Sequence, residues 1–362
     1  MRLVILAFII FSSLLLAHDS EYIHVDDFFI KFPEEKLKHE NFNTLVQNNP
    51  IKVSKKQLKP IKISIVYPGK QIGDYWRRSK VSFEKRLQKL GIEYELKDYF
   101  TKPNTEIREQ ARQILESIND GSDYLIFTLE ATKHKKLIEQ LRRVQKPKLI
   151  LQNITTPLKE WKERGPFLYV GFDHIEGSKM IADYLIKTVS KNAKYGVLFH
   201  TKDGYLSEMR GDSFIDYIDK NTDFKLVDSY YTEMDFDRAY NSTKALVEKN
   251  PNLDFIYACS TDIAYGALRA LKELQRKDII INGWGGGTKE LASIKNGDLA
   301  VTAMRMNDDN GIAMAEAIKL DLERRGDEIP TVFSGKIELI NSQNIDKVDA
   351  LIDRAFIYSG RQ

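Results

Sequence analysis

The sequence predicts an α/β protein of two lobes, each built from a parallel sheet flanked by helices. Three observations favour this fold class. The chain has 362 residues, enough for two domains of ordinary size. From residue 61 onward, short apolar runs alternate with helical stretches, which is the spacing of βαβ units. These runs are too numerous for the sheet of a single lobe, so we divide them between two.

The apolar runs that we expect to form strands fall into two series, separated at Thr155–Pro157. The first series is Ile61–Tyr67, Tyr94–Tyr99, Tyr124–Leu129 and Lys148–Gln152. The second series is Phe167–Phe172, Tyr195–Phe199, Lys225–Tyr231, Phe255–Cys259, Ile279–Gly283 and Ala300–Met304.

The stretch after the first run has the pattern of a helix that packs on a sheet. Asp74 suits its N-cap and Gly91 its end. Residues on one face recur at steps of three and four, and most of them are large and apolar. They are Trp76, Lys80, Phe83, Leu87 and Leu90. A further helix is expected at Asp308–Glu323.

Each lobe is expected to take two pieces of the chain. The N-terminal lobe would comprise residues 59–156 plus 285–305, and the C-terminal lobe residues 157–284 plus 306–362. Residues 18–58 would form a mostly helical N-terminal extension. No internal repeat or low-complexity segment stands out.

The first residues predict export. Arg2 precedes the apolar run Leu3–Leu16, and Ala17 offers a small residue for cleavage. This is the pattern of a secretory signal peptide over residues 1–17. The alternative is a retained anchor, but the run is short for a membrane span. We therefore expect a periplasmic protein.

Charge and cysteine usage exclude several classes. The formal net charge is +3, from 55 basic and 52 acidic residues, whereas nucleic-acid binders usually show a basic surplus. The single cysteine, Cys259, allows no internal disulfide. It lies in an apolar run, where a buried strand cysteine is a better interpretation than a nucleophile.

Signatures of enzymes are absent from the sequence. It contains neither a Walker A loop nor a Gly-x-Ser-x-Gly elbow, and its glycine run does not complete a dinucleotide fingerprint. The six histidines do not pair at metal-ligand spacing. We therefore expect a binding protein that is not an enzyme, with no metal and no cofactor.

Candidate ligand-binding residues follow from the strand order, because ligands of open parallel sheets bind beyond the carboxyl ends of the strands. The residues just after the expected strands include arginines, tryptophans, amides and one carboxylate. A tryptophan offers a flat wall for a compact ring, amides and carboxylates orient hydroxyls, and guanidinium groups hold an anion. The candidates are Gln71, Gly73, Trp76, Asn153, Arg210, Thr261, Asp262, Trp284 and Arg305.

Each candidate also has a purely structural interpretation. Trp76 lies on the apolar face of its helix and suits core packing equally well. Arg210 could form a surface ion pair, and Asp262 could cap the next helix. The glycines around Trp284 could serve a tight turn or hinge. Arg305 ends an apolar strand, where a surface charge is less natural.

Long strings of the sequence resemble the LuxP-type periplasmic autoinducer-2 receptors of vibrios, relatives of the ribose-type periplasmic binding proteins. The resemblance covers most of the chain after residue 58 and implies the hinged, two-lobe type I periplasmic binding protein fold. The strings are Pro60–Gly69, Ser122–Leu129, Leu149–Pro157, Phe255–Asp262, Ile281–Gly287 and Met304–Asp309.

The ligand implied by this resemblance is autoinducer-2, a furanosyl borate diester whose tetrahedral boron carries a negative charge; boron would be present only as part of the ligand. The resemblance assigns Arg210 and Arg305 to the borate, and Trp76 and Trp284 to the ring. Ligand oxygens would be bound by Gln71, Asn153, Asp262 and the backbone of Thr261. Gly73 departs from the family pattern, which has a serine there.

The resemblance also implies a partner, the periplasmic domain of a LuxQ-like hybrid sensor kinase, which would respond to lobe closure on the ligand. Three rival functions share parts of the pattern. A sugar-binding protein of an ABC transporter would not require two arginines for a neutral pentose. A transcriptional repressor would need a DNA-binding N-terminus in place of a signal peptide. A secreted enzyme would need an acid–base pair, and Asp262 alone is available.

Overall fold

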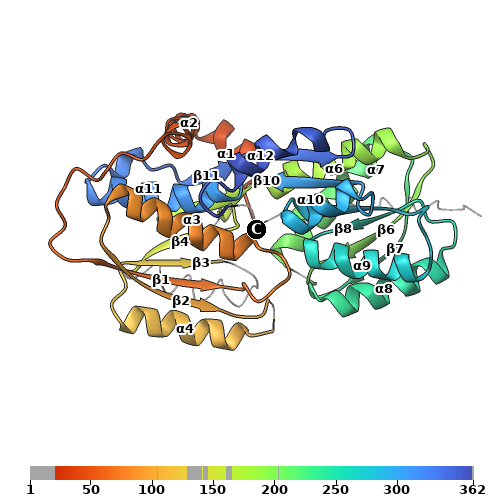
Figure 1. The fold of residues 1–362 in the computed structure, drawn as a ribbon, viewed down its shortest axis with the longest axis horizontal. Helices are drawn as coiled ribbons and strands as arrows, with labels where there is room; N and C mark the ends of the chain where they lie inside the picture. Colours follow the sequence, from red (N-terminus) through yellow and green to blue (C-terminus); the bar gives the residue numbers. More distant parts are fainter. Residues whose placement is uncertain are drawn as a thin grey trace, which may run out of the picture.

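The structure is a computed structural model that describes residues 21–103, 105–128, 141, 146–159, 165–202 and 204–360. The expected signal peptide, residues 1–17, and residues 18–20 of the expected extension lie outside the described residues. Two lobes lie side by side along the long axis of the molecule (Figure 1). Each lobe contains a six-stranded sheet with helices on its faces.

The first sheet has the order β11-β5-β4-β3-β1-β2, and all its neighbouring strands are parallel. Its strands are β1 (Ile61–Tyr67), β2 (Tyr94–Phe100), β3 (Tyr124–Phe127), β4 (Lys148–Gln152), β5 (Leu168–Phe172) and β11 (Val332–Gly335).

The second sheet has the order β12-β10-β9-β8-β6-β7, with β12 antiparallel to β10 and the other pairs parallel. Its strands are β6 (Lys194–Phe199), β7 (Lys225–Tyr231), β8 (Phe255–Ala258), β9 (Ile280–Gly285), β10 (Val301–Arg305) and β12 (Ile337–Asn341).

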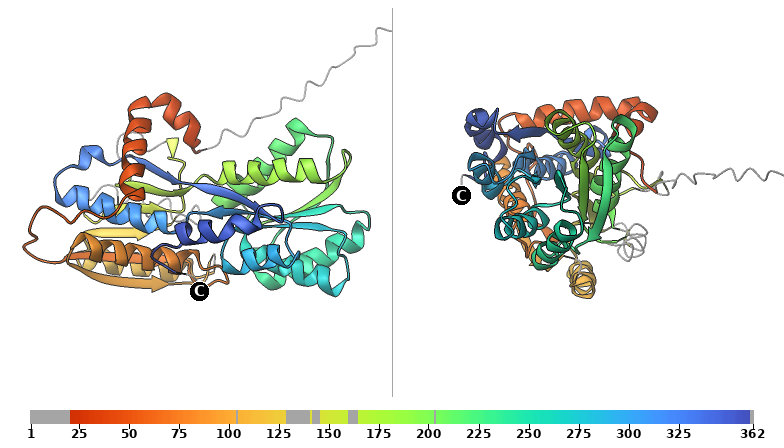
Figure 2. Two further views of the ribbon diagram at one scale, coloured as in Figure 1. Left: turned by 45° about the horizontal axis from the view of Figure 1, so that its top comes forward. Right: turned by 90° about the vertical axis from the view of Figure 1, so that its right-hand side faces the viewer.

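Helices cover both faces of each sheet (Figures 1 and 2). In the first lobe these are α3 (Tyr75–Leu90), α4 (Ile107–Asn119) and α11 (Asp308–Leu322). The helices of the second lobe are α6 (His174–Thr188), α7 (Ser213–Asn221), α8 (Phe236–Lys249), α9 (Thr261–Glu273), α10 (Thr288–Lys295) and α12 (Val348–Ala355).

The sequence pattern of β1 shows why the strands read as continuous apolar runs. Ile63 and Ile65 join one hydrophobic cluster of the first lobe, whereas Val66 joins the cluster on the opposite face of the sheet. A strand that is buried on both faces has no polar face to alternate with. The second lobe has a hydrophobic core of its own around β6, β8 and β9.

The ten strands expected from the sequence are all present, with bounds within two residues of the expected ones. The sequence analysis did not predict β11 and β12. Helix α3 begins after Asp74 and ends at Gly91, whose φ of +70° suits a glycine C-cap. The Asp74 side chain makes no capping bond and instead accepts a hydrogen bond from Arg78 Nε at 2.6 Å.

The sheet membership corrects the expected lobe boundaries. Strand β5, which we expected in the C-terminal lobe, pairs with β4 in the first sheet. Residues 285–305, expected in the N-terminal lobe, contain β10, which pairs with β9 in the second sheet. Helix α11 and strand β11 return to the first lobe. The chain therefore passes between the lobes after β5, after β10 and after β11, and local sequence patterns do not reveal these crossings.

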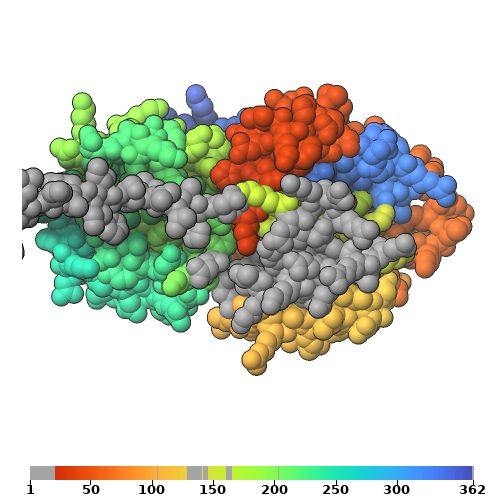
Figure 3. All heavy atoms as spheres, turned by 180° about the vertical axis from the view of Figure 1, so that it is seen from behind, coloured from red at the N-terminus to blue at the C-terminus, as the bar shows by residue number. Residues whose placement is uncertain are grey.

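The N-terminal extension is helical over α1 (Val25–Lys31) and α2 (Pro33–Gln47), as expected. Helix α2 packs on α11 and β11 of the first lobe, and Figure 3 shows the extension (red) beside blue segments of that lobe and the green edge of the second lobe. Tyr22 pairs with Leu158, and its ring lies 4.9 Å from the ring of Tyr205 in the second lobe.

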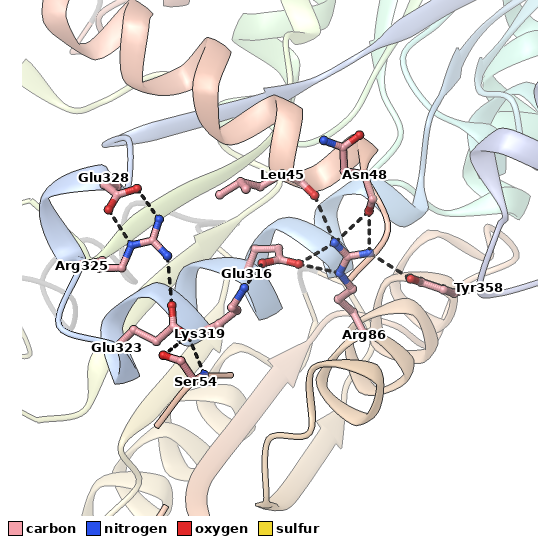
Figure 4. A network of polar contacts seen from close by, with 10 residues as sticks. All are labelled: Leu45, Asn48, Ser54, Arg86, Glu316, Lys319, Glu323, Arg325, Glu328 and Tyr358. Carbon is pink, nitrogen blue, oxygen red and sulfur yellow. Dashed lines mark hydrogen bonds and ion pairs between the residues drawn. The ribbon is translucent and has the colours of Figure 1, made fainter. Parts of the chain in front are cut away.

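A buried arginine of the first lobe, Arg86, joins this extension to that lobe (Figure 4). Arg86 of α3 donates through Nε to Glu316 of α11 at 2.7 Å, and both side chains are 2% exposed. The same guanidinium donates to the carbonyl oxygens of Leu45 and Asn48 in the extension, and to the Tyr358 hydroxyl near the C-terminus. One buried cation therefore ties both ends of the described chain to α3.

In the described part of the chain, no helix combines the length and the apolar character needed to cross a membrane.

Candidate ligand-binding site

A cavity of about 380 Å³ lies between the two lobes. Its size falls in the range usual for small-molecule sites. The walls are formed by residues at the carboxyl ends of strands from both sheets, where the topology of parallel sheets places ligands.

All nine candidate residues from the sequence analysis line this cavity. The first lobe contributes Gln71, Gly73, Trp76 and Asn153. The second lobe contributes Arg210, Thr261, Asp262, Trp284 and Arg305. The structure therefore brings together residues that lie up to 234 positions apart in the sequence, from Gln71 to Arg305.

Arg210 lies in a π-helical segment, Ser207–Asp212, that leads into α7. Such segments are frequent at functional sites. Its side chain is 4% exposed, so the alternative of a surface ion pair is wrong. Nη1 donates to the carbonyl oxygen of Cys259 at 2.8 Å, and the guanidinium lies 3.6 Å from the ring centroid of Trp284. Burial, and next the nearby charge of Arg305, lower the pKa of Arg210 to about 9.

Arg305 ends β10 and is 8% exposed. Its Nε is buried without a hydrogen-bond partner, and its guanidinium lies 4.1 Å from the ring centroid of Tyr75. Gly285, at φ +138°, makes room for it, because a Cβ there would lie 2.8 Å from Arg305 Nη2. Burial lowers the pKa of this guanidinium as well.

The two arginines form a cationic wall that no described carboxylate contacts at ion-pair distance, although the charges of Glu290 and Asp74 act on Arg305. Among the described residues, neither guanidinium takes part in an ion pair. Buried charges are normally paired, and two like charges in one cavity repel each other. The wall is therefore complementary to an anion.

Trp284 is held in place by buried neighbours. The Glu290 carboxylate accepts from the backbone NH groups of Trp284 and Gly286, at 3.0 and 2.8 Å, and so fixes the turn after β9. Gly177 on α6 lets the indole approach, since a Cβ at Gly177 would lie 2.7 Å from Trp284 Cζ2. The indole is thus a rigid wall of the cavity.

Asp262 does not cap α9, because its carboxylate reaches across to the first lobe. It accepts hydrogen bonds from the backbone NH of Ile72 at 3.0 Å and of Gly73 at 3.2 Å. Burial raises the pKa of this carboxyl. A Cβ at Gly73 would meet Asp262 Oδ1 and Gln71 Nε2 at 3.8 Å, so the cavity has room for the serine of the family pattern.

The amides and the first tryptophan complete the wall. Gln71 Oε1 and Asn153 Oδ1 are buried acceptors without a partner among the described residues. Asn153 has a φ of +67°, a conformation that asparagine tolerates better than most residues. Trp76 is 4% exposed and packs on Tyr67, with ring centroids 4.7 Å apart. It is therefore both part of the core and part of the cavity wall.

Sequence reasoning missed several lining residues. They include Tyr75, Thr128, His200, Tyr205, Met234 and Glu290. Thr128 and His200 directly follow β3 and β6, so the strand-end rule could have found them. Tyr205 and Met234 lie in loops and carry no comparable signal. Ser260, close after β8, also lines the cavity, and its hydroxyl has no partner among the described residues.

The arrangement suits binding. Cys259 is fully buried, as expected, and burial raises the pKa of its thiol. Across the described residues, no group of three or more His, Cys, Asp or Glu side chains could hold a metal ion. Unpartnered donors and acceptors around a small cavity, beside flat aromatic walls, are the features of a site for a compact polar ligand.

Comparisons with known proteins agree with this architecture. Residues 63–325 match the model of a family described as periplasmic binding protein domain. The ribose import binding protein RbsB of Salmonella typhimurium is 23% identical over 175 residues, 48% of this chain and 58% of that protein. The chain therefore matches little more than half the length of that relative.

Solved structures of the same fold include a periplasmic solute binding protein from Actinobacillus succinogenes with bound D-allose. It is 19% identical with a TM-score of 0.68, covering 80% of this chain and 100% of that chain. A structure of the XylFII-LytSN complex matches with a TM-score of 0.67 at 18% identity, covering 79% and 99%. The expected type I fold is confirmed, and the chain belongs to the periplasmic binding protein family.

Proposed function

We propose that this protein is a periplasmic receptor for the anionic furanosyl borate form of autoinducer-2. The observation that carries the proposal is the pair of buried guanidiniums, Arg210 and Arg305, that face one cavity and form no ion pair with any described residue. An anion with several oxygens would satisfy both groups with charge-assisted hydrogen bonds.

The remaining wall supports a compact ring with hydroxyl groups. Trp76 and Trp284 supply flat apolar surfaces, while Gln71 and Asn153 supply free acceptors for hydroxyl protons. A neutral pentose would satisfy the amides but leave the repulsion between the two arginines uncompensated. We therefore favour a cyclic polyol that carries a negative charge.

The second candidate is a sugar-binding protein of an ABC transporter. It is favoured by the relatives, since the curated protein described above is named as a ribose import binding protein. A transport protein would use the same cavity as the receptor, but its ligand would be a neutral sugar in place of an anion.

Signalling would follow from lobe closure. A ligand that contacts both lobes shifts the population toward the closed state, which changes the surface offered to a partner. We propose the periplasmic domain of a LuxQ-like hybrid sensor kinase as that partner. The XylFII-LytSN complex supports the idea that a protein of this fold can present itself to another protein.

Isothermal titration tests the ligand. Purified protein is titrated with autoinducer-2 in borate-depleted buffer and again after addition of boric acid, and with ribose in both buffers. We expect tight binding of autoinducer-2 only with boric acid. Equal affinity for autoinducer-2 in the two buffers would remove the borate assignment, and tight, borate-independent binding of ribose would establish the transport candidate.

A further inference from the structure

His174 stands behind the wall of the cavity, at the point where the chain passes from β5 of the first lobe into α6 of the second. Its side chain is 1% exposed. Asp173 caps α6 by accepting from the backbone NH groups of Ile175 and Glu176 at 2.9 and 3.2 Å, which fixes the first turn of the helix. The backbone at His174 is thus fixed.

The two ring nitrogens of His174 have different partners, and these define the tautomer. Nε2 lies 3.1 Å from the carbonyl oxygen of Asn153, which can only accept, so Nε2 carries the proton. Nδ1 is then free to accept, and it lies 3.3 Å from Nε and 3.2 Å from Nη2 of Arg210. Burial, and next the charge of Arg210, hold the pKa of His174 well below its usual value.

These contacts join site residues from the two lobes. Asn153 directly follows β4 of the first lobe, whereas Arg210 belongs to the second. The imidazole also packs against the Trp284 indole, with ring centroids 5.4 Å apart. The same indole contacts the Arg210 guanidinium. One neutral ring therefore contacts three residues that line the cavity.

The orientation of Arg210 depends on few contacts. Its side chain has many rotamers, and its other bond within the wall runs from Nη1 to the carbonyl of Cys259. Without an acceptor at Nδ1, the Nε and Nη2 groups would be left buried without a partner. The guanidinium would then be free to turn away from the cavity.

We propose that His174 is a positioning residue for ligand binding: its Nδ1 orients Arg210 toward the cavity, and its Nε2 contact with Asn153 of the first lobe fixes the tautomer that leaves Nδ1 free to accept. The inference rests on the proposed function in one respect, namely that Arg210 contacts the ligand.

Two substitutions separate the roles of the two nitrogens. His174→Asn keeps an oxygen acceptor near the place of Nδ1 but loses the reach to Asn153. His174→Gln places its amide donor near Nε2 and loses the acceptor for Arg210. His39→Gln is a matched control, because this half-buried histidine also contacts a backbone carbonyl, that of Ser334 in β11, and does not line the cavity.

Binding is measured by titration of autoinducer-2 with boric acid. We expect His174→Gln to weaken binding at least tenfold, His174→Asn to remain within about threefold of the unmodified protein, and His39→Gln to have no effect. If the Asn and Gln variants lose affinity equally, or neither loses it, the positioning role is overturned.

Nuclear magnetic resonance of the ligand-free protein keeps this test separate from the ligand assignment. With ¹⁵N-labelled arginine, the Arg210 Nε–H resonance should move or broaden in His174→Gln and stay in place in His174→Asn. If the unmodified protein binds no borate ester but these resonances behave as stated, only the proposed ligand fails.

The unmodified protein provides a measurement that needs no variant. Two-bond ¹⁵N spectra of labelled histidine should show His174 as the Nε2–H tautomer at neutral pH. A proton on Nδ1 would overturn the inference, since that nitrogen could not accept from Arg210.

Discussion

Replacing Arg305 by methionine is the most informative change to the cavity. Methionine keeps most of the side-chain length and apolar volume but removes the charge. In the ligand-free protein Arg305 is 8% exposed, and its Nε has no hydrogen-bond partner in the described part of the chain. Its charge also contributes to lowering the pKa of Arg210 to about 9. The ligand-free protein therefore loses an unfavourable interaction when this charge is removed.

The bound state should respond in the opposite direction. Hydrogen bonds to charged groups contribute about 1.5–3 kcal/mol each, so loss of one such bond to an anionic ligand weakens binding roughly 10- to 150-fold. Titration of Arg305→Met with autoinducer-2 and boric acid measures this loss, and thermal unfolding without ligand measures the stability. We expect the unfolding midpoint to stay the same or rise.

A suitable control is Arg112→Met, because Arg112 is exposed on α4 and pairs with Glu109 and Glu116 on the surface. Exposed ion pairs contribute little to stability, so both measurements should stay unchanged. The reasoning is refuted if Arg305→Met binds the ligand as tightly as the unmodified protein. A fall of more than about 5 °C in the ligand-free midpoint would instead give Arg305 a structural role.

Three further changes test other parts of the structure. Gly177→Ala places a Cβ 2.7 Å from Trp284, so it should cost about 1–3 kcal/mol in urea unfolding and shift the tryptophan fluorescence; unchanged spectra would contradict the packing. Burial lowers the pKa of His200 from its ordinary value of 6.5 to about 3. As the pH falls below 6.5, the unfolded chain therefore takes up a proton at this histidine before the folded protein does. From pH 7.5 to pH 5 the protein should therefore lose about 2 kcal/mol of stability on this account. His200→Gln should reduce this dependence of stability on pH. An equal slope of unfolding free energy against pH in both proteins would contradict the role of His200. Glu316→Leu leaves Arg86 buried and unpaired, and should destabilise the fold by about 3–5 kcal/mol in chemical denaturation without changing ligand affinity. A loss below 1 kcal/mol would mean that Arg86 finds other partners.

The strands were predictable because each is a local pattern. In β1, Ile63, Ile65 and Val66 are apolar on both faces of the sheet, and such a run stands out without knowledge of its neighbours. Strands β11 and β12 escaped prediction because they are short and follow one another directly. Their place is decided by pairing with β5 and β10, which lie far away in the sequence.

That the candidate residues line one cavity was predictable, but the contacts that each of them makes were not. The strand ends indicated Arg210 and Asp262 among the candidates, because ligands of a parallel sheet bind beyond the carboxyl ends of its strands. The sequence left open an ion pair for Arg210 and a helix cap for Asp262. The structure instead buries Arg210 against Trp284 and joins Asp262 to the first-lobe backbone at Ile72.

The sequence by itself determined the alternation of strands and helices and the set of residues at the strand ends, since both depend on periodicity within a few residues. Tertiary structure alone decided which sheet β5 and β10 join, that Arg210 and Arg305 share a cavity, and that His174 contacts Arg210 from behind the cavity wall. These features depend on contacts between segments separated by tens to hundreds of residues. Burial and pairing at such contacts are set by how the whole chain packs, and no local pattern encodes them.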